Sequence, residues 1–211
     1  MPGLRMVLAS NNAKKLSELQ ALLGGLPLHL VTQGSLGIAE ADEPHDTFIE
    51  NALAKARHAA AATGGAAIAD DSGLCVDALG SAPGVISAHY AGELPATGDR
   101  EARRRVQDAA NNAKLLDALR DTTDRRAHFI CTLVAVRHAL DPQPLVAVGR
   151  WPGEILAAPR GASGFGYDPL MFIPELGRSV AELDTDTKNA HSHRARATAQ
   201  MRALLQDVWR L

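Results

Sequence analysis

Two adjacent aspartates, Asp70 and Asp71, follow an apolar run that ends at Ala69, and they precede Ser72. If that run is a strand, the carboxylates of the two aspartates lie at the C-terminal end of the strand, where ligand sites of α/β sheets are found. Neighbouring strand residues point to opposite faces, so the two acids are expected to have different roles. Such carboxylates can hold Mg²⁺ with a phosphate substrate or polarise a water. Asp-Asp-Ser-Gly is also common turn chemistry, and this alternative stays open.

An acidic cluster lies upstream, just before a predicted helix, and consists of Glu40, Asp42, Glu43 and Asp46. Acids in this position commonly stabilise a helix N-terminus through its dipole. One of them could also supply an oxygen ligand and complete a metal site with the two aspartates. The residues alone leave both alternatives open.

Three polar residues, Ser10, Asn11 and Asn12, lie with Lys15 where a predicted strand is followed by a helix. Free backbone N–H groups and the helix dipole make such a junction an anion-binding position, and these side chains add donors. The same residue types are also frequent helix caps. The chain contains no G-x-x-x-x-G-K-[ST] pattern, which argues against a P-loop kinase or ATPase.

The segment Gly164-Phe165-Gly166-Tyr167-Asp168 is rich in glycine and carries two of the few aromatic residues of the chain. Glycines allow close approach, and an aromatic face can stack on a base. A tight loop that packs Phe165 into the core would have the same sequence. The segment is therefore a candidate base-binding loop.

Several donors gather near the start of the last predicted helix, namely Lys188, His193 and Arg194. They suit a phosphate or a carbonyl oxygen, and a solvated basic helix end is the alternative. His191 and His193 have a metal-like spacing, but no third nitrogen or sulfur ligand is spaced to join them, which argues against zinc.

Apolar periodicity and capping signals predict the elements that position these residues. Strands are expected over Leu4–Ala9, over Ala66–Ala69 and the segment after it, and over His128–Val136 and Pro144–Trp151, the last two as a hairpin, with a turn over Gly80–Gly84. Helices are expected from Leu16 to Gly24, from a capping box at Thr47 and Glu50 to Gly64, over Asp99–Arg120, and from His193 to Leu211. This mixture predicts an α/β fold with a mixed sheet, and the lack of a linker predicts a single domain over residues 1–211.

The same periodicity predicts how the apolar residues of two helices are arranged. In the helix over Asp99–Arg120, Ala102, Val106, Ala110 and Ala113 are expected to share one face. In the C-terminal helix the inward residues are expected to be Ala199, Leu204, Val208 and Leu211.

The composition argues against several classes of protein. The 22 Lys and Arg residues nearly balance 24 Asp and Glu, and a net charge of −2 argues against non-specific duplex binding. No apolar stretch reaches the ~18 residues of a membrane span, and the first residues lack the pattern of a secretory signal. By their spacing, Cys75 and Cys131 form no disulfide framework and no zinc motif. We expect a cytoplasmic protein without a membrane or nucleic-acid partner.

Taken together and in this order, five segments resemble the inosine triphosphate pyrophosphatase family, which hydrolyses aberrant purine nucleoside triphosphates. They are Leu8–Lys15, Thr47–Ala60, Ala69–Gly92, Gly164–Pro169 and Ser192–Arg194. Two positions depart from the family pattern: His89 stands where members usually carry Arg, and Ala195 where Gly usually follows the His-Arg pair. These departures concern local packing or fine specificity rather than the acids and lysines.

The resemblance implies an elongated mixed β-sheet with flanking helices that form two lobes around a central nucleotide cleft, and a homodimer. It also implies Mg²⁺-dependent cleavage between the α and β phosphates of ITP, dITP and XTP. The products would be the nucleoside monophosphate and pyrophosphate.

The resemblance also assigns roles to individual residues. The triphosphate would be held by Ser10, Asn12, Lys15 and Lys188, with Asn11 in the same segment. Mg²⁺ would be bound by Glu43, Asp70 and Asp71. Asp71 would be the general base or would orient the attacking water, with Lys15 and Lys55 assisting. The remaining substrate contacts would come from Ser72, from Phe165 stacked on the purine, from Gly166, Tyr167 and Asp168 along the pocket, and from His193 and Arg194 facing the base.

Hydrogen bonding offers a reason for the choice of base. Hypoxanthine and xanthine carry a 6-oxo acceptor, whereas adenine carries a 6-amino donor. Donors from His193 and Arg194 would pair with the oxo group and would be left unpaired by the amino group. Guanine also has the 6-oxo group, so it must be rejected around its 2-amino group.

Two rival functions remain. A Maf-like pyrophosphatase of different base specificity would be expected to carry Arg at the position of Lys15 and to lack the Ser-His-Arg segment. A nucleotide-binding sensor without turnover is disfavoured because Asp70, Asp71 and the lysines are all present.

Overall fold

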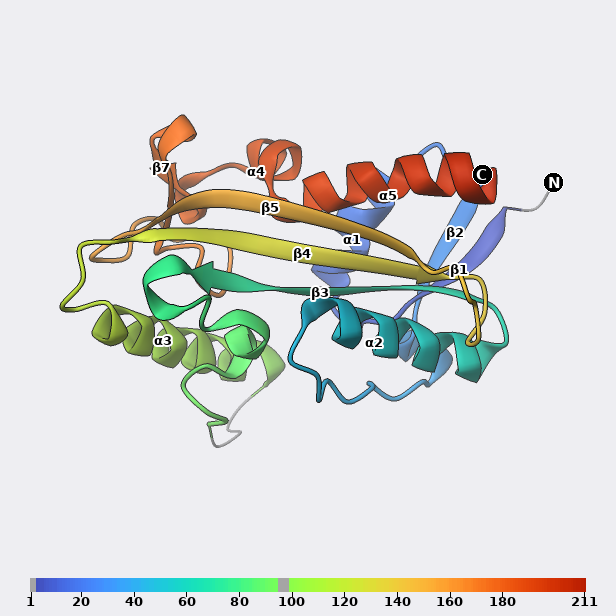
Figure 1. Ribbon diagram of the computed structural model, residues 1–211, viewed down its shortest axis with the longest axis horizontal. Helices are drawn as coiled ribbons and strands as arrows, with labels where there is room; N and C mark the ends of the chain where they lie inside the picture. Colours follow the sequence, from blue (N-terminus) through green and yellow to red (C-terminus); the bar gives the residue numbers. More distant parts are fainter. Residues whose placement is uncertain (1–2, 95–98) are drawn as a thin grey trace. The chain divides into compact units, whose positions relative to one another are not determined.

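A seven-stranded mixed sheet organises the computed structural model, which describes residues 3–94 and 99–211 (Figure 1). The strand order is β2-β1-β3-β4-β5-β6-β7, with β1 parallel to β2 and β3, and with β6 antiparallel to β5 and β7. The elements are β1 (Leu4–Leu8), α1 (Ala13–Leu22), β2 (Leu28–Thr32), α2 (Phe48–Thr63), β3 (Ala66–Val76), α3 (Arg100–Ala118), β4 (Arg126–Val136), β5 (Leu145–Ile155), β6 (Met171–Ile173), β7 (Arg178–Ser179), α4 (Thr185–His191) and α5 (His193–Trp209). This confirms the predicted α/β fold with a mixed sheet.

The chain divides into two compact units that alternate along the sequence. The first comprises Met1–Ser72, Cys131–Arg150 and Ser192–Leu211, and the second comprises Gly73–Ile130 and Trp151–His191. The three long strands β3, β4 and β5 therefore each contribute residues to both units. Within the described segments, no helix is both long and apolar enough to cross a membrane.

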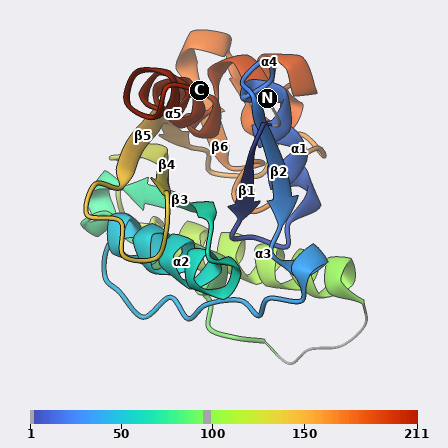
Figure 2. The same ribbon diagram turned by 90° about the vertical axis from the view of Figure 1, so that its right-hand side faces the viewer.

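The first unit has a core on each face of its part of the sheet. Met6 and Leu8 of β1 pack in one core with α1 and α5, while Val7 packs in another with the alanines of α2. Because strand side chains alternate, one apolar run serves both cores. Figure 2 shows β1 and β2 side by side and running in the same direction.

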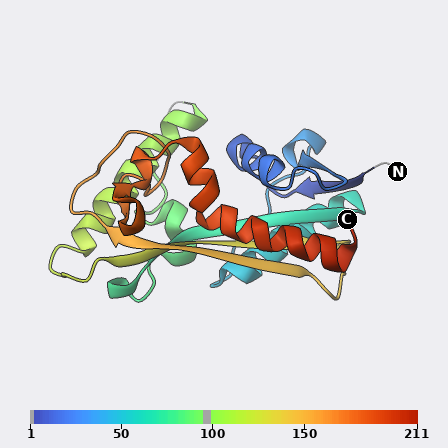
Figure 3. The same ribbon diagram turned by 90° about the horizontal axis from the view of Figure 1, so that it is seen from above.

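Close packing of α5 on β5 depends on a glycine. A Cβ atom at Gly149 would collide with the carbonyl oxygen of His193 and would lie 2.5 Å from the backbone nitrogen of Ala197. The missing side chain lets the start of α5 lie directly on the strand (Figure 3). This contact positions His193 and its neighbour Arg194.

The second unit has its own core around Trp151, and α3 contributes Leu115 and Leu119 to it. The face of α3 that carries Ala102, Val106, Ala110 and Ala113 does not pack into this core: three of these residues are exposed and Ala110 is half-buried. Alanines bury little apolar area, so their spacing does not decide the orientation of a helix. The inward residues are Asn111, Leu115 and Leu119.

Asn111 stabilises this orientation of α3 through hydrogen bonds. Its Oδ1 accepts from the backbone of Ala91 at 2.8 Å, and its Nδ2 donates to the carbonyl of Ala88 at 3.0 Å. A buried amide whose oxygen and nitrogen are both hydrogen-bonded is stable in a core. The spacing of apolar residues does not predict such a buried polar position.

The predicted inward face of α5 is wrong at two positions, because Ala199 and Val208 are exposed. Leu204 and Leu211 do pack against the first core, although they are only partly buried. The fully buried positions include two polar residues, Arg194 and Thr198, together with Ala197, Met201 and Leu205. Ala197, Met201 and Leu205 are spaced four residues apart, so they form the apolar stripe that packs inward, and Arg194 and Thr198 lie on the same side of the helix.

Other local predictions hold at the element ends. Thr47 caps α2 by accepting from the backbone of Glu50, and Gly64 ends the helix with a φ of 66°. The strand predicted over Ala66–Ala69 and the segment after it is confirmed as β3, which ends at Val76. Asp70 and Asp71 therefore lie in the middle of a strand, and both their expected position at its C-terminal end and the turn alternative are wrong.

Candidate active site

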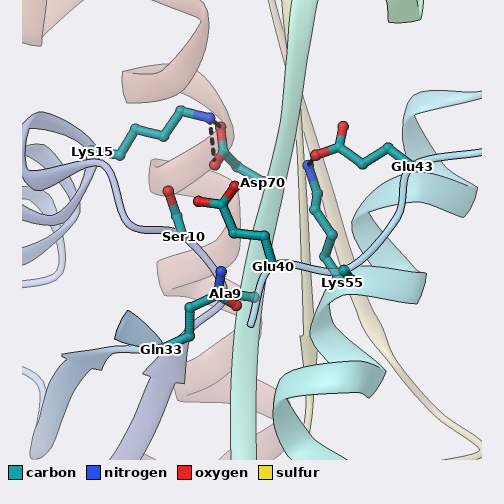
Figure 4. Close-up of a pocket in the computed structure, with 9 residues that line it drawn as sticks. Ala9, Ser10, Lys15, Gln33, Glu40, Glu43, Lys55 and Asp70 are labelled. Carbon is teal, nitrogen blue, oxygen red and sulfur yellow. Dashed lines mark hydrogen bonds and ion pairs between the residues drawn. The ribbon is translucent and has the colours of Figure 1, made fainter. Parts of the chain in front are cut away.

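A pocket in the first unit gathers polar residues from five segments of the chain (Figure 4). It is lined by Ala9, Ser10, Lys15, Gln33, Glu40, Ala41, Glu43, Lys55 and Asp70. Ala9 and Ser10 follow β1 directly, so the pocket lies at the carboxyl end of that strand. Ligand sites of parallel α/β sheets occupy this position.

The two adjacent aspartates face opposite sides of β3. The carboxylate of Asp70 lies 2.9 Å from Lys15 Nζ of α1 and 3.5 Å from the guanidinium of Arg194 on α5. The carboxylate of Asp71 instead lies 3.3 Å from Lys55 Nζ of α2. The predicted separation of the two acids by strand alternation is confirmed.

Asp70 is a fully charged, fully paired group. Burial alone would raise the pKa of its carboxyl, but Lys15, Arg194 and Lys55 outweigh burial and hold the pKa well below its usual range. Ser72 adds a hydrogen bond, donating from Oγ to Oδ2 of Asp70 at 3.0 Å. The carboxylate of Asp70 therefore has cationic or hydroxyl partners on both of its oxygens.

Asp71 is in the opposite electrostatic state. Burial raises the pKa of its carboxyl to about 6, with Glu43 adding to the rise and Lys55 opposing it. Its Oδ2 is buried without a hydrogen-bond partner in the described part of the chain. A carboxylate with a free oxygen and a pKa near neutrality is suited to proton transfer.

Lys55 links Asp71 to the acidic cluster. Its Nζ lies 2.9 Å from Glu43 Oε1, and burial, which lowers the pKa of the ammonium, is outweighed by Asp71, Asp70 and Glu43. Glu43 belongs to the segment between β2 and α2, which α2 anchors: Asn51 exchanges two hydrogen bonds with the backbone of His45.

The carboxylates at and beside this pocket fit Mg²⁺. Glu43 lines the pocket and Asp71 does not, but oxygens of both converge on one cation, the ammonium of Lys55, and Asp71 Oδ2 has no hydrogen-bond partner among the described residues. Mg²⁺ on a phosphate substrate needs only one or two protein carboxylates besides waters. Among residues 3–94 and 99–211, no group of three or more His, Cys, Asp or Glu side chains is arranged to hold a metal. The set Glu43, Asp70 and Asp71 therefore stays a prediction.

The segment from Ser10 to Lys15 is folded by its own polar side chains. Ser10 Oγ accepts from the backbone of Asn12 at 3.1 Å, and Asn12 Oδ1 accepts from the backbone of Lys15 at 3.4 Å. Asn11 donates to Glu40 at 2.9 Å. These bonds cap the start of α1 and hold the predicted phosphate-binding residues at the pocket.

A second group of predicted site residues lies in the second unit. Asp168 accepts from the backbone of Phe165 at 2.9 Å and from Lys188 Nζ at 2.7 Å. Phe165 is half-buried, with Lys188 Nζ 4.8 Å from its ring centroid. Gly166 is held by Asn112, which donates to its carbonyl. The loop is tight, as expected if it packed Phe165 into the core instead of binding a base. The ring of Phe165 is nevertheless only half-buried and lies outside the core.

Three predicted residues have partners within the protein. Tyr167 is buried and donates from its hydroxyl to the carbonyl of Ser87 at 2.8 Å. Arg194 is 4% exposed and donates to Glu18 at 2.6 Å, besides its contact with Asp70. His193 is 9% exposed at the start of α5.

Residues 6–204 match the Ham1 family. This chain belongs to the Ham1 family. Its curated Ham1 relatives include the dITP/XTP pyrophosphatase of Methylibium petroleiphilum, 70% identical over 206 residues that cover 98% of this chain and 99% of the relative. The dITP/XTP pyrophosphatase of Leptothrix cholodnii is 66% identical over 211 residues, covering 99% and 100%.

Solved structures of Ham1 proteins share the fold. The HAM1 protein from Coxiella burnetii matches with a TM-score of 0.88 and 44% identity over 97% of this chain and 100% of its own. The Ham1 protein of Staphylococcus aureus matches with a TM-score of 0.82 and 36% identity over 96% and 98%. The family resemblance and the fold class are thereby confirmed.

Four further residues of this Ham1-family chain lie at the predicted groups and belong to none of the motifs described above. Gln33 lines the first pocket, Glu18 binds Arg194, and Arg104 and Asp108 of α3 contact the loop that carries Phe165. Glu18 stands one helical turn after Lys15, a spacing that places both on one side of α1. The others carry no local signal, because tertiary packing alone brings them to the site.

Proposed function

We propose that this chain is a Mg²⁺-dependent pyrophosphatase that converts ITP, dITP and XTP to the nucleoside monophosphate and pyrophosphate. The observation that supports the proposal is the different electrostatic state of two neighbouring carboxylates. Asp70 is paired with Lys15 and Arg194, while Asp71 has an oxygen without a hydrogen-bond partner and a pKa of about 6. The curated relatives at 70% and 66% identity are named dITP/XTP pyrophosphatases, which supports the same chemistry here.

Positioning and charge neutralisation supply most of the catalysis in phosphoryl transfer. We assign the triphosphate to Ser10, Asn12 and Lys15, because they combine a hydroxyl, an amide and an ammonium at the N-terminus of α1. The helix dipole favours an anion at that end. Lys188 and Asn11 are assigned to the substrate as well.

Glu43, Asp70 and Asp71 would hold the Mg²⁺. When bound, this ion neutralises phosphate charge and makes a bound water more acidic. Glu43 is the most adaptable of the three, because its side chain is 45% exposed and lies on a segment without helix or strand.

Asp71 takes the proton of the attacking water. The water oxygen forms a bond to the α phosphorus, the bond from that phosphorus to the α–β bridging oxygen breaks, and pyrophosphate leaves. At neutral pH a carboxyl with a pKa of about 6 is mostly ionised and still basic enough to accept a proton. Lys55, 3.3 Å from Asp71, keeps this carboxylate oriented, and Lys15 offsets charge on the phosphates.

For the base, we assign stacking to Phe165, whose loop Asp168 and Lys188 stabilise. Gly166 permits close approach, Tyr167 supports the loop, and Ser72 contacts the substrate. His193 and Arg194 are assigned as donors to the 6-oxo group of hypoxanthine and xanthine.

A substrate panel tests the proposal. Purified protein is supplied with ITP, dITP, XTP, GTP, ATP or dTTP, and the phosphate product is identified. Pyrophosphate is expected, with faster turnover of ITP, dITP and XTP than of the others, and with loss of activity in EDTA that Mg²⁺ restores. Release of orthophosphate, or equal rates on ATP and ITP, would refute the reaction; full activity in EDTA would refute the metal.

We also propose that the enzyme is a cytoplasmic homodimer. Ile86 and Val106 in the second unit are 54% and 57% exposed, and we take these two apolar side chains as the starting point for locating the face that a second copy would cover. Light scattering is expected to give twice the mass of 22.3 kDa, and cell fractionation is expected to recover the protein with cytoplasmic markers. A monomer at micromolar concentration would contradict the dimer.

A further inference from the structure

An aromatic ring with two cations beside it forms the centre of the group in the second unit. Arg104 Cζ lies 4.3 Å from the ring centroid of Phe165, closer than Lys188 Nζ at 4.8 Å. A cation within about 6 Å of a ring centroid is attracted by the electrons of the ring face. Arg104 comes from the first half of α3, far in sequence from the loop that carries Phe165.

The loop and α3 are joined by hydrogen bonds as well as by the ring contact. The backbone N–H of Gly166 donates to Asp108 at 2.8 Å, and Asn112 Nδ2 donates to the carbonyl of Gly166 at 3.0 Å. Arg104, Asp108 and Asn112 are spaced four residues apart, so they lie on one side of the helix. The position of the ring beside Arg104 is therefore fixed by the backbone.

Arg104 differs from Arg103 and Arg105 because its guanidinium N–H donors are not engaged in hydrogen bonds. Arg105 forms an ion pair with Glu101 at 3.2 Å, and Arg103 donates to the carbonyl of Asp99 at 3.4 Å. Within residues 3–94 and 99–211, the guanidinium of Arg104 forms no hydrogen bond or ion pair; it contacts the face of Phe165 and interacts electrostatically with Asp108. A half-buried guanidinium with free donors beside a ring is poised for a flat ligand that carries acceptors.

We propose that Arg104 is a specificity-determining residue: an oxo-purine that stacks on Phe165 takes the place of the guanidinium on the ring face, and the displaced guanidinium binds the acceptor edge of the base. This inference rests on the proposed function. The planar fork of a guanidinium pairs with two acceptors at once, as O6 and N7 of an oxo-purine offer. Adenine has a 6-amino donor in place of O6, so it would leave a guanidinium donor unpaired. Arg104 thus favours hypoxanthine and xanthine over adenine.

Arg104→Ala tests the inference, with Arg105→Ala as the matched control that removes the neighbouring charge from the same helix. Steady-state kinetics are measured on ITP, XTP and ATP. Arg104→Ala is expected to raise KM for ITP and XTP about tenfold, the effect of one lost two-point contact, with little change in kcat. KM for ATP is expected to stay the same, and Arg105→Ala is expected to behave as the unmodified enzyme.

Arg104→Lys separates charge from geometry, because lysine keeps the charge but loses the fork. It is expected to lose discrimination between ITP and ATP as Arg104→Ala does. A purely structural role of Arg104 would lower kcat/KM for all three nucleotides alike, and that result, or a discrimination equal to that of Arg105→Ala, would overturn the inference.

Measurements of product binding test the role of Arg104 in base recognition independently of the proposed hydrolysis. Affinities for IMP and AMP are measured by calorimetry with the unmodified protein and with both alanine variants. A preference for IMP that Arg104→Ala abolishes supports the inference even if no pyrophosphate is released, in which case only the proposed function fails. Equal affinities of the unmodified protein for IMP and AMP would overturn the inference even if ITP is hydrolysed.

Discussion

Asparagine substitution of the two adjacent aspartates is expected to change the free energy of unfolding in opposite directions. Burial raises the pKa of Asp71 from 3.8 to about 6, so its ionised form destabilises the folded state at neutral pH. Such a rise corresponds to about 3 kcal/mol. Asp71→Asn removes this cost and weakens one contact of Lys55, which keeps Glu43 at 2.9 Å. We expect Asp71→Asn to be more stable by about 1–3 kcal/mol at pH 7.5 and to have lost turnover.

The dependence on pH follows from the direction of the shift. An acid whose pKa is higher in the folded than in the unfolded state binds more protons when folded, between pH 3.8 and about 6. Over that range the stability contributed by Asp71 falls as the pH rises, and the full cost applies above it. The gain from Asp71→Asn is therefore expected to be small near pH 4 and complete above pH 6.

Asp70→Asn is the matched comparison one residue away. Burial would raise the pKa of Asp70, but Lys15, Arg194 and Lys55 hold it well below its usual range, so its charge stabilises the folded state. The substitution would leave Arg194, 4% exposed, with a single carboxylate partner. Breaking a buried ion pair in this way costs about 3–5 kcal/mol.

Urea unfolding at 25 °C in EDTA measures all three proteins at pH 4.5 and 7.5, and pyrophosphate release with Mg²⁺ measures turnover. The EDTA is required because a bound cation would stabilise the ionised carboxylates. If Asp71→Asn destabilises the protein as much as Asp70→Asn does, or if its gain is the same at both pH values, the electrostatic reasoning is wrong. Substantial residual turnover of Asp71→Asn would remove Asp71 from its catalytic role.

Two further substitutions probe the parts that position the site. Gly149→Ala is expected to destabilise the protein by about 3 kcal/mol, because the added Cβ would collide with the start of α5. The control Gly65→Ala, whose Cβ would have no atom within 4 Å, is expected to change stability by less than about 1 kcal/mol. Equal melting temperatures of the two variants would contradict the packing argument. Arg194→Ala is expected to lower the melting temperature, because Glu18 and Asp70 lose their shared partner. It is also expected to reduce the preference for ITP over ATP, because a donor to the 6-oxo group is lost. An unchanged ratio of kcat/KM for ITP to kcat/KM for ATP would show that Arg194 does not face the base.

Local patterns predicted much of the first unit correctly. The start and end of α2 follow from Thr47, Glu50 and Gly64, because capping depends on residues a few positions apart. The opposite orientation of Asp70 and Asp71 follows from the two-residue period of a strand, which holds in any tertiary context.

The helix faces show where local patterns stop. In α3 the alanine stripe indicates one side, yet Asn111 and two leucines pack inward because hydrogen bonds and larger apolar area decide. In α5 a buried, paired Arg194 lies where periodicity predicts a polar exterior. In both helices the buried polar residue binds a partner that lies more than 15 residues away in sequence.

By itself, the sequence determined the family, the α/β class and the acids, lysines and aromatic loop on which the proposed chemistry depends, because each is a matter of residue type and short spacing. Only the tertiary structure decided which cation each acid meets: Lys15 and Arg194 for Asp70, and Lys55 for Asp71. It alone placed Arg104 on the ring of Phe165. The physical reason is that a pKa, an ion pair or a ring contact depends on distances between side chains, and those distances are set by helices packing on a sheet rather than by positions along the chain.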